Sequence, residues 1–167
     1  MKKKTAPATE KLSTQEETGS PFLGIKSVLV PLDFSAESKK ALAYAVPFAR
    51  QFGARLTLLH VIEPVATPDF AQTFPLMIED DKLMAAAKSE LRRVVQDSGI
   101  EPNLVEKTLV RFGRSFHEIA EAARTLKVDL IIIATHGHTG LKHVLLGSTT
   151  ERVVRHAPCP VLVVRQR

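Results

Sequence analysis

Two glycine-rich segments toward the C-terminal end carry the residue types that bind phosphate groups. Residues 147–150 (GSTT) open an expected helix, where unpaired N–H groups, hydroxyls and the positive end of the helix dipole favour an anion. In residues 134–140 (ATHGHTG), Gly137 and Gly140 let the backbone approach a ligand closely. Taken alone, the first segment is more simply an ordinary capped helix. Two such turns leaving one region of a sheet favour phosphate binding.

A carboxylate stands where a strand is expected to end. Asp33 follows the apolar run 27–32 (SVLVPL), and there it can accept hydrogen bonds from hydroxyls or backbone amides. It suits an Asx turn into the next helix equally well, and the sequence leaves both interpretations open. The usual nucleotide signatures are absent, since the chain has neither G-x-x-x-x-G-K-[ST] nor a G-x-G-x-x-G after its first strand.

The histidines give a weaker signal. His136, His138 and His143 are close in sequence, but no cysteine or carboxylate lies beside them, and zinc sites usually take three or four ligands. We therefore expect no metal site built from protein side chains. His60 is expected to be a satisfied histidine in the core or at a pocket edge. No nucleophile stands beside an evident base, so no catalytic residue is expected.

Alternating strand and helix patterns must position these segments. Apolar runs predict five strands, at 27–32, 55–61, 104–112, 129–134 and 160–164. Helical periodicity predicts a helix in each interval between them. Such alternation implies a parallel sheet with helices on both faces and right-handed crossovers. Ligands of open sheets of this class bind beyond the carboxyl ends of the strands, which is where the polar segments above fall.

Local signals predict how the helices begin. Ser35 is a good N-cap for the first helix. The pairs Ser115 with Glu118 and Ser148 with Glu151 both have the spacing of a capping box. They are therefore expected to open the third and fourth helices.

Length and composition predict one globular domain. The chain has 167 residues, 18.4 kDa and 44% hydrophobic residues, which suits a single core. Residues 1–20 contain almost nothing apolar larger than alanine, so we expect a disordered tail at 1–22, followed by one domain at 23–167. No apolar run approaches the roughly 20 residues of a membrane span. Residues 1–20 have lysines but no apolar stretch behind them, so they are not expected to be a secretory signal. A single cysteine fits a reducing compartment, so a cytoplasmic protein is expected.

The basic charge does not predict a nucleic-acid-binding protein. The formal net charge is +5, which weakly favours anionic ligands. The chain has one tyrosine, no tryptophan and no basic–aromatic stripe, so readout by base stacking is not expected.

Three separated motifs resemble the universal stress protein family over residues 26–165. Val30 to Asp33 (VPLD) matches the family's opening V-P-x-D, and 159–164 (CPVLVV) matches its last strand. The ATP-binding subgroup has G-x2-G-x9-G-[ST], which Gly137, Gly147 and Ser148 match. Ala134 occupies the first position of that pattern, and it keeps the strand tip small.

The resemblance implies a Rossmann-like nucleotide-binding fold with strand order 3-2-1-4-5. It also implies binding of ATP, or of AMP or ADP, with Mg²⁺ or Mn²⁺ coordinated by phosphate oxygens. Asp33 and the backbone of 31–32 would lie beside the adenosine, and the backbone of Val61 would face adenine. Residues 134–140 would wrap the ribose and phosphates, and 148–150 would hold the phosphates. The implied ATP-binding positions are Pro31, Leu32, Asp33, Val61, Ala134, Thr135, His136, Gly137, His138, Thr139, Gly140, Gly147, Ser148, Thr149 and Thr150.

The family resemblance also implies a homodimer that pairs the last strands. Its interface would consist of Val161, Leu162, Val163 and Val164. An apolar strand at the edge of a sheet needs covering, which supports this dimer on physical grounds.

Two functions from different classes follow from the sequence. The first is a cytoplasmic ATP-binding stress-response or signalling module with an unidentified protein partner. It is not expected to be an enzyme, and ATP hydrolysis is slow at most, because neither an arginine finger nor a positioned base is evident. The second is a nucleotide-free dimeric interaction scaffold, which only Ala134 favours. An adenylating synthase is disfavoured, because its loop after strand one is glycine-rich and residues 33–36 (DFSA) contain no glycine.

Overall fold

The structure, a computed structural model, describes residues 24–64, 77–135 and 147–165, with side chains from residue 81 onward in the second segment. The tail expected at 1–22 therefore lies outside the described residues. Among the helices of these segments, none combines the length and apolarity needed to cross a membrane.

Five parallel strands form one sheet in the order β3-β2-β1-β4-β5. This confirms the α/β class, the parallel sheet and the strand order. The strands are β1 (Ser27–Pro31), β2 (Arg55–Ile62), β3 (Val105–Phe112), β4 (Leu130–Ala134) and β5 (Val161–Val164).

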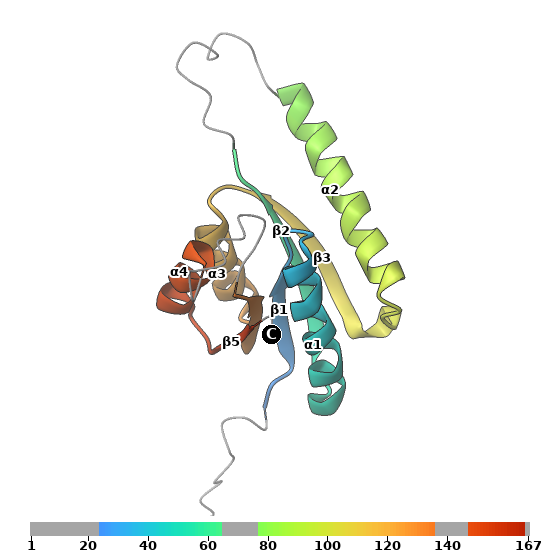
Figure 1. The fold of residues 1–167 in the computed structure, drawn as a ribbon, viewed down its shortest axis with the longest axis vertical. Helices are drawn as coiled ribbons and strands as arrows, with labels where there is room; N and C mark the ends of the chain where they lie inside the picture. The colour runs from blue at the N-terminus through green and yellow to red at the C-terminus, as the bar shows by residue number, and fades with distance from the viewer. Residues whose placement is uncertain (1–23, 65–76, 136–146, 166–167) are drawn as a thin grey trace, which may run out of the picture.

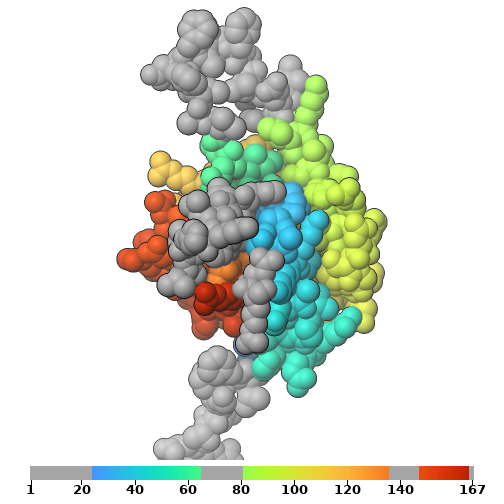
Figure 2. Space-filling model, in the orientation of Figure 1, coloured from blue at the N-terminus to red at the C-terminus, as the bar shows by residue number. Residues whose placement is uncertain are grey.

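Helices cover both faces of the sheet, as expected. They are α1 (Ala36–Phe52), α2 (Met77–Asp97), α3 (Ser115–Leu126) and α4 (Ser148–His156), with a 3-10 turn η2 (Pro102–Leu104) before β3. Figure 1 shows α1 and α2 on one side of the strands and α3 and α4 on the other. In the space-filling view, α2 and α4 form opposite flanks with α1 between them (Figure 2).

The alternating direction of strand side chains divides the core into two clusters. Val28 and Val30 of β1 pack with α1 and α2, whereas Leu29 between them packs with α3 and α4. Ile132 of β4 likewise packs toward α1 and α2, and Ile131 packs toward α3 and α4. Strands buried on both faces read as continuous apolar runs, which explains why both strands were evident in the sequence.

The first helix begins as its sequence predicts. Ser35 is the N-cap of α1, and its hydroxyl oxygen accepts a hydrogen bond from the N–H of Ser38 at 3.1 Å. This bond satisfies one of the unpaired donors at the helix start. Gly53 ends α1 in the left-handed conformation, with φ 62°, which glycine adopts without steric cost.

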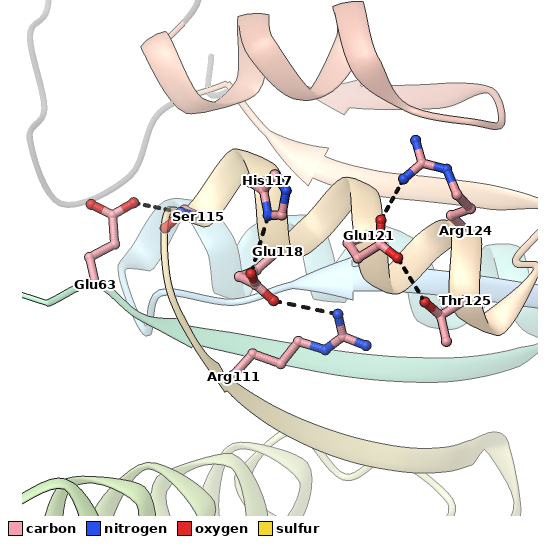
Figure 3. Close-up of polar contacts among 8 residues, drawn as sticks. All are labelled: Glu63, Arg111, Ser115, His117, Glu118, Glu121, Arg124 and Thr125. Atoms are coloured by element: carbon pink, nitrogen blue, oxygen red, sulfur yellow. Dashed lines mark hydrogen bonds and ion pairs between the residues drawn. The ribbon is translucent and has the colours of Figure 1, made fainter. Parts of the chain in front are cut away.

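The two predicted capping boxes are wrong. Ser115 and Ser148 are the first residues inside α3 and α4, and neither helix has a side-chain cap from its own N-cap residue. At α3, Glu118 turns away to Arg111 and His117 (Figure 3). At α3 a glutamate distant in sequence, Glu63, takes the place of the local cap, whereas α4 begins without a side-chain cap.

Candidate functional site

A cavity of about 270 Å³ opens at the carboxyl edge of the sheet. We call it the edge cavity. Its walls come from the ends of β1, β2 and β4 and from the N-terminal ends of α1, α3 and α4. The lining residues are Pro31, Leu32, Asp33, Ser38, Leu59, Val61, Glu63, Ser115, Ile119, Ile133, Ala134, Gly147, Ser148, Thr149 and Thr150.

Most of the predicted site residues that the structure describes share this cavity. Those that line it are Pro31, Leu32, Asp33, Val61, Ala134, Gly147, Ser148, Thr149 and Thr150. Thr135 is buried next to Ala134 without lining the cavity. Predicted site residues His136, Gly137, His138, Thr139 and Gly140 lie outside the described residues.

Strand order explains why these residues meet. The chain leaves β1 toward β2 on one side and reaches β4 on the other, so β1 is the strand at which the order reverses. Crossovers on opposite faces leave a crevice at such a point. The ends of β1 and β4 and the start of α4 all face that crevice.

Asp33 forms the Asx turn that its position suggested and also lines the edge cavity. Its Oδ1 accepts hydrogen bonds from the N–H of Ser35, at 3.0 Å, and from the Ser35 hydroxyl. Between them Phe34 takes a left-handed backbone with φ 66°. The two interpretations of Asp33 are therefore compatible, because the turn fixes one carboxylate oxygen while the residue remains in the cavity wall.

His60 is a satisfied histidine beside the cavity. Its Nδ1 lies 2.7 Å from the carbonyl oxygen of Leu32, so Nδ1 carries the proton and donates. Its ring stacks on Phe34 with centroids 4.2 Å apart. The contacts hold the β1 turn against β2, which is a positioning role rather than a chemical one.

The start of α4 is tied to the end of β4 by hydrogen bonds. The Gly147 N–H donates to the carbonyl of Thr135 at 2.7 Å. The buried Thr150 hydroxyl donates to the carbonyl of Ala134 at 2.8 Å. Ser148 is exposed and Thr149 half-buried, and both line the cavity. The Thr150 hydroxyl hydrogen is thus committed to the fold, whereas Ser148 and Thr149 face the cavity from a helix start.

Alanine at position 134 fits its backbone. Ala134 is the last residue of β4, and it is not among the described non-glycine residues with positive φ, which are Phe34 and Lys127. The backbone at this position therefore does not require glycine. What the alanine adds is one methyl group in the cavity wall.

Helix α3 supplies cavity residues that the sequence did not point to, among them Ser115 and Ile119. The Ser115 N–H donates to Oε1 of Glu63 at 2.7 Å (Figure 3). Glu63 follows β2, so a carboxylate from across the site caps α3 in place of the expected local box. Hydrogen bonds from the Ser115 hydroxyl and N–H lower the pKa of Glu63 below its usual value of 4.5. Its position just after a strand was the only sequence signal.

Replacing Glu63 by glutamine should lower the free energy of unfolding by about 0.5–1 kcal/mol at neutral pH, because the charged cap is lost while an amide oxygen remains. Because the pKa of Glu63 is lowered in the folded state, its ionised carboxylate stabilises the fold above the usual pKa of 4.5. This stabilisation is lost as the pH falls through the lowered pKa. The wild-type advantage over Glu63→Gln should therefore shrink in acid. Urea unfolding of both proteins across this range measures it.

The control is Glu106→Gln, which changes a glutamate on β3 that lies 3.7 Å from Lys107 and caps no helix among the described residues. Its difference from wild type should not follow the same acid profile. A Glu63→Gln difference that persists unchanged well below pH 4.5 would contradict the charged cap.

No metal centre forms within the described segments, where no group of three or more His, Cys, Asp or Glu side chains could hold an ion. His136, His138 and His143 lie outside those segments.

The predicted dimer residues occupy an edge strand. β5 pairs with β4 on one side and is the last strand of the sheet. Val164 is buried and Leu162 is 40% exposed. An exposed apolar edge strand offers backbone groups to a second chain.

Comparison with known proteins finds one family repeatedly. The model of the universal stress protein family matches residues 24–165. The universal stress protein MJ0531 of Methanocaldococcus jannaschii is 33% identical over 143 residues, covering 84% of this chain and 82% of that protein. The solved structure of universal stress protein UspA from Lactobacillus plantarum has TM-score 0.70 and 31% identity, covering 84% and 97% of the two chains. That of MJ0577 from M. jannaschii has TM-score 0.71 and 32% identity, covering 85% and 96%.

Proposed function

This chain belongs to the universal stress protein family, and we propose that it binds ATP in the edge cavity and serves as a stress-response or signalling module in the cytoplasm. Nucleotide binding would alter its affinity for a protein partner. The proposal includes a homodimer through β5 and slow ATP hydrolysis at most.

The observation that carries the proposal is the chemistry of the edge cavity. Leu59, Val61 and Ile133 give it apolar walls, which suit a nucleoside. The start of α4 adds Ser148 and Thr149 beside the free N–H groups of a helix N-terminus, and these suit phosphate. The cavity approaches the size of small-ligand sites, which begin at about 300 Å³. Mg²⁺ or Mn²⁺ would be held through phosphate oxygens.

The exposed apolar edge of β5 supports the proposed homodimer. Pairing of residues 161–164 with the same strand of a second copy would satisfy that edge and bury Leu162. Analytical ultracentrifugation tests this part separately from nucleotide binding.

The alternative is a nucleotide-free dimeric scaffold, for which Ala134 is the specific observation. Its methyl group narrows the cavity at the position where the motif has glycine. The strand conformation of Ala134 removes any need for a positive φ, so the ATP-binding proposal is the better supported of the two.

Two steps test the function. Protein purified without added nucleotide is denatured, and its supernatant is separated by ion exchange. Emptied protein is then titrated with ATP and Mg²⁺ in a calorimeter. We expect released adenine nucleotide or saturable ATP binding. A protein that releases no nucleotide and does not bind added ATP, yet remains a folded dimer, would support the scaffold instead.

Ser148→Ala should weaken ATP binding by about threefold to tenfold, because one hydroxyl hydrogen bond to phosphate is lost. Because Ser148 is exposed, this substitution should change the free energy of unfolding little. Ser98→Ala, at an exposed position after α2, is the matched control and should bind as wild type does. Equal affinities of Ser148→Ala and Ser98→Ala would count against phosphate at the start of α4.

A further inference from the structure

A second cavity, of about 260 Å³, adjoins the edge cavity at the start of α4. It is lined by Glu63, Arg114, Phe116, Ser148, Thr149 and Arg152. We call it the arginine cavity. It shares Glu63, Ser148 and Thr149 with the edge cavity, so a ligand at the start of α4 can extend from one into the other.

Two guanidinium groups stand in the walls of the arginine cavity. Arg114 is the N-cap residue of α3, and Arg152 lies one turn into α4. The Arg152 guanidinium sits over the Phe116 ring, 5.1 Å from its centroid, which holds a flexible side chain in place. The two charges come from different helices, and both line the same cavity.

Neither arginine forms a close ion pair in the described segments, and, after the hydrogen bonds from Ser115, the positive charge of Arg114 also helps to lower the pKa of the neighbouring Glu63. Within the described segments, neither Arg114 nor Arg152 lies within 4.0 Å of a carboxylate, whereas Arg155 on the same helix pairs with Glu151 at 2.8 Å. The one carboxylate in the cavity wall, Glu63, is turned toward Ser115 (Figure 3). The arginine cavity therefore combines two guanidiniums, two hydroxyls and one carboxylate that is already hydrogen-bonded.

We propose that the arginine cavity is a subsite for the distal phosphates of a nucleoside triphosphate, so that this chain selects ATP over AMP. This inference rests on the proposed function, because it takes the phosphate nearest the nucleoside to lie at the start of α4. From there a longer phosphate chain passes Ser148 and Thr149 and meets Arg114 and Arg152. Guanidinium groups bind phosphate oxygens through paired N–H donors. AMP does not reach them.

The test compares AMP and ATP binding to the full chain by calorimetry in Mg²⁺. Wild type should bind ATP about tenfold more tightly than AMP, since charge-assisted hydrogen bonds add to the distal phosphates. The double variant Arg114→Ala/Arg152→Ala should lose that preference while its AMP affinity stays unchanged. Arg155→Ala, which removes an arginine of α4 outside both cavities, is the matched control and should keep the preference. Thermal unfolding checks that each variant folds.

Several results would overturn the inference. Equal wild-type affinities for AMP and ATP would do so. If wild type then binds a polyglutamate peptide and the double variant does not, the two arginines bind an acidic protein instead. A preference for ATP that survives in the double variant would also overturn it. If wild type binds neither nucleotide, the proposed function fails, and inorganic tripolyphosphate decides the subsite. If wild type binds tripolyphosphate and the double variant does not, an anion site at the two arginines is supported. If wild type does not bind tripolyphosphate, the anion site is overturned as well.

Discussion

Gly147→Val should weaken ATP binding about a hundredfold or more, equivalent to roughly 3 kcal/mol, while the chain still folds. Gly147 lines the edge cavity and is the N-cap residue of α4. A valine side chain there would occupy the space through which a phosphate approaches the free N–H groups of the helix. Removing that approach removes the dipole and the hydrogen bonds together.

The fold should survive because Gly147 does not use a conformation reserved for glycine. Its φ of −65° and ψ of 149° are open to any L-residue. Its N–H would continue to donate to the Thr135 carbonyl. Valine is a poorer N-cap than glycine, so a loss of about 1 kcal/mol in stability is expected and is separable from the binding defect.

Calorimetric titration with ATP measures the effect, and thermal unfolding monitors the fold. Gly24→Val is the matched control, since Gly24 is exposed and a side chain there would meet nothing within 4 Å. A Gly147→Val protein that melts normally and binds ATP as tightly as wild type would refute phosphate binding at the start of α4.

The centre of the sheet was predictable because β1 and β4 are buried on both faces. Runs such as 27–32 and 129–134 can satisfy their side chains only between two layers of helices, and β1 and β4 have that environment. The convergence of Asp33 with the segment that opens α4 was predictable from parallel topology, whereas Val61 was indicated only by the family resemblance. Caps within a few residues, such as Ser35, were equally accessible.

Contacts between distant segments were not predictable. Glu63 caps α3 across 52 residues, and no local spacing encodes such a pair. Ser115 and Ile119 were not predictable for the same reason, because the positions of strand ends do not indicate which helix lies beside the cavity. Arg114 and Arg152 are 38 positions apart by their numbers, and only the packing of α3 beside α4 places them in one cavity.

At the start of α4, the hydroxyl of Thr150 has a structural role rather than a ligand-binding one. Its side chain is 4% exposed, and its hydroxyl donates to the Ala134 carbonyl at 2.8 Å. Thr150→Val keeps the shape and removes the donor. We expect the free energy of unfolding to fall by about 1–3 kcal/mol, because the buried hydrogen bond between α4 and β4 is lost.

Denaturant unfolding of three variants isolates this effect. Thr150→Ser keeps the donor and should recover most of the stability that Thr150→Val loses. Thr125→Val, at an exposed threonine of α3, is the control and should change stability by less than about 0.5 kcal/mol. A Thr150→Val protein as stable as wild type would show that the bond to Ala134 contributes nothing.

The same variants bear on how the site divides its work. If the Thr150 hydroxyl serves the fold, Thr150→Ser should bind ATP as wild type does, whereas Ser148→Ala binds less well at unchanged stability. The N–H of Thr150 remains one of the unpaired donors of the helix start, so this residue still contributes to an anion site through its backbone. Phosphate recognition would then rest on the exposed hydroxyl of Ser148 and on backbone N–H groups, which Thr150 holds in position by anchoring α4 to the end of β4.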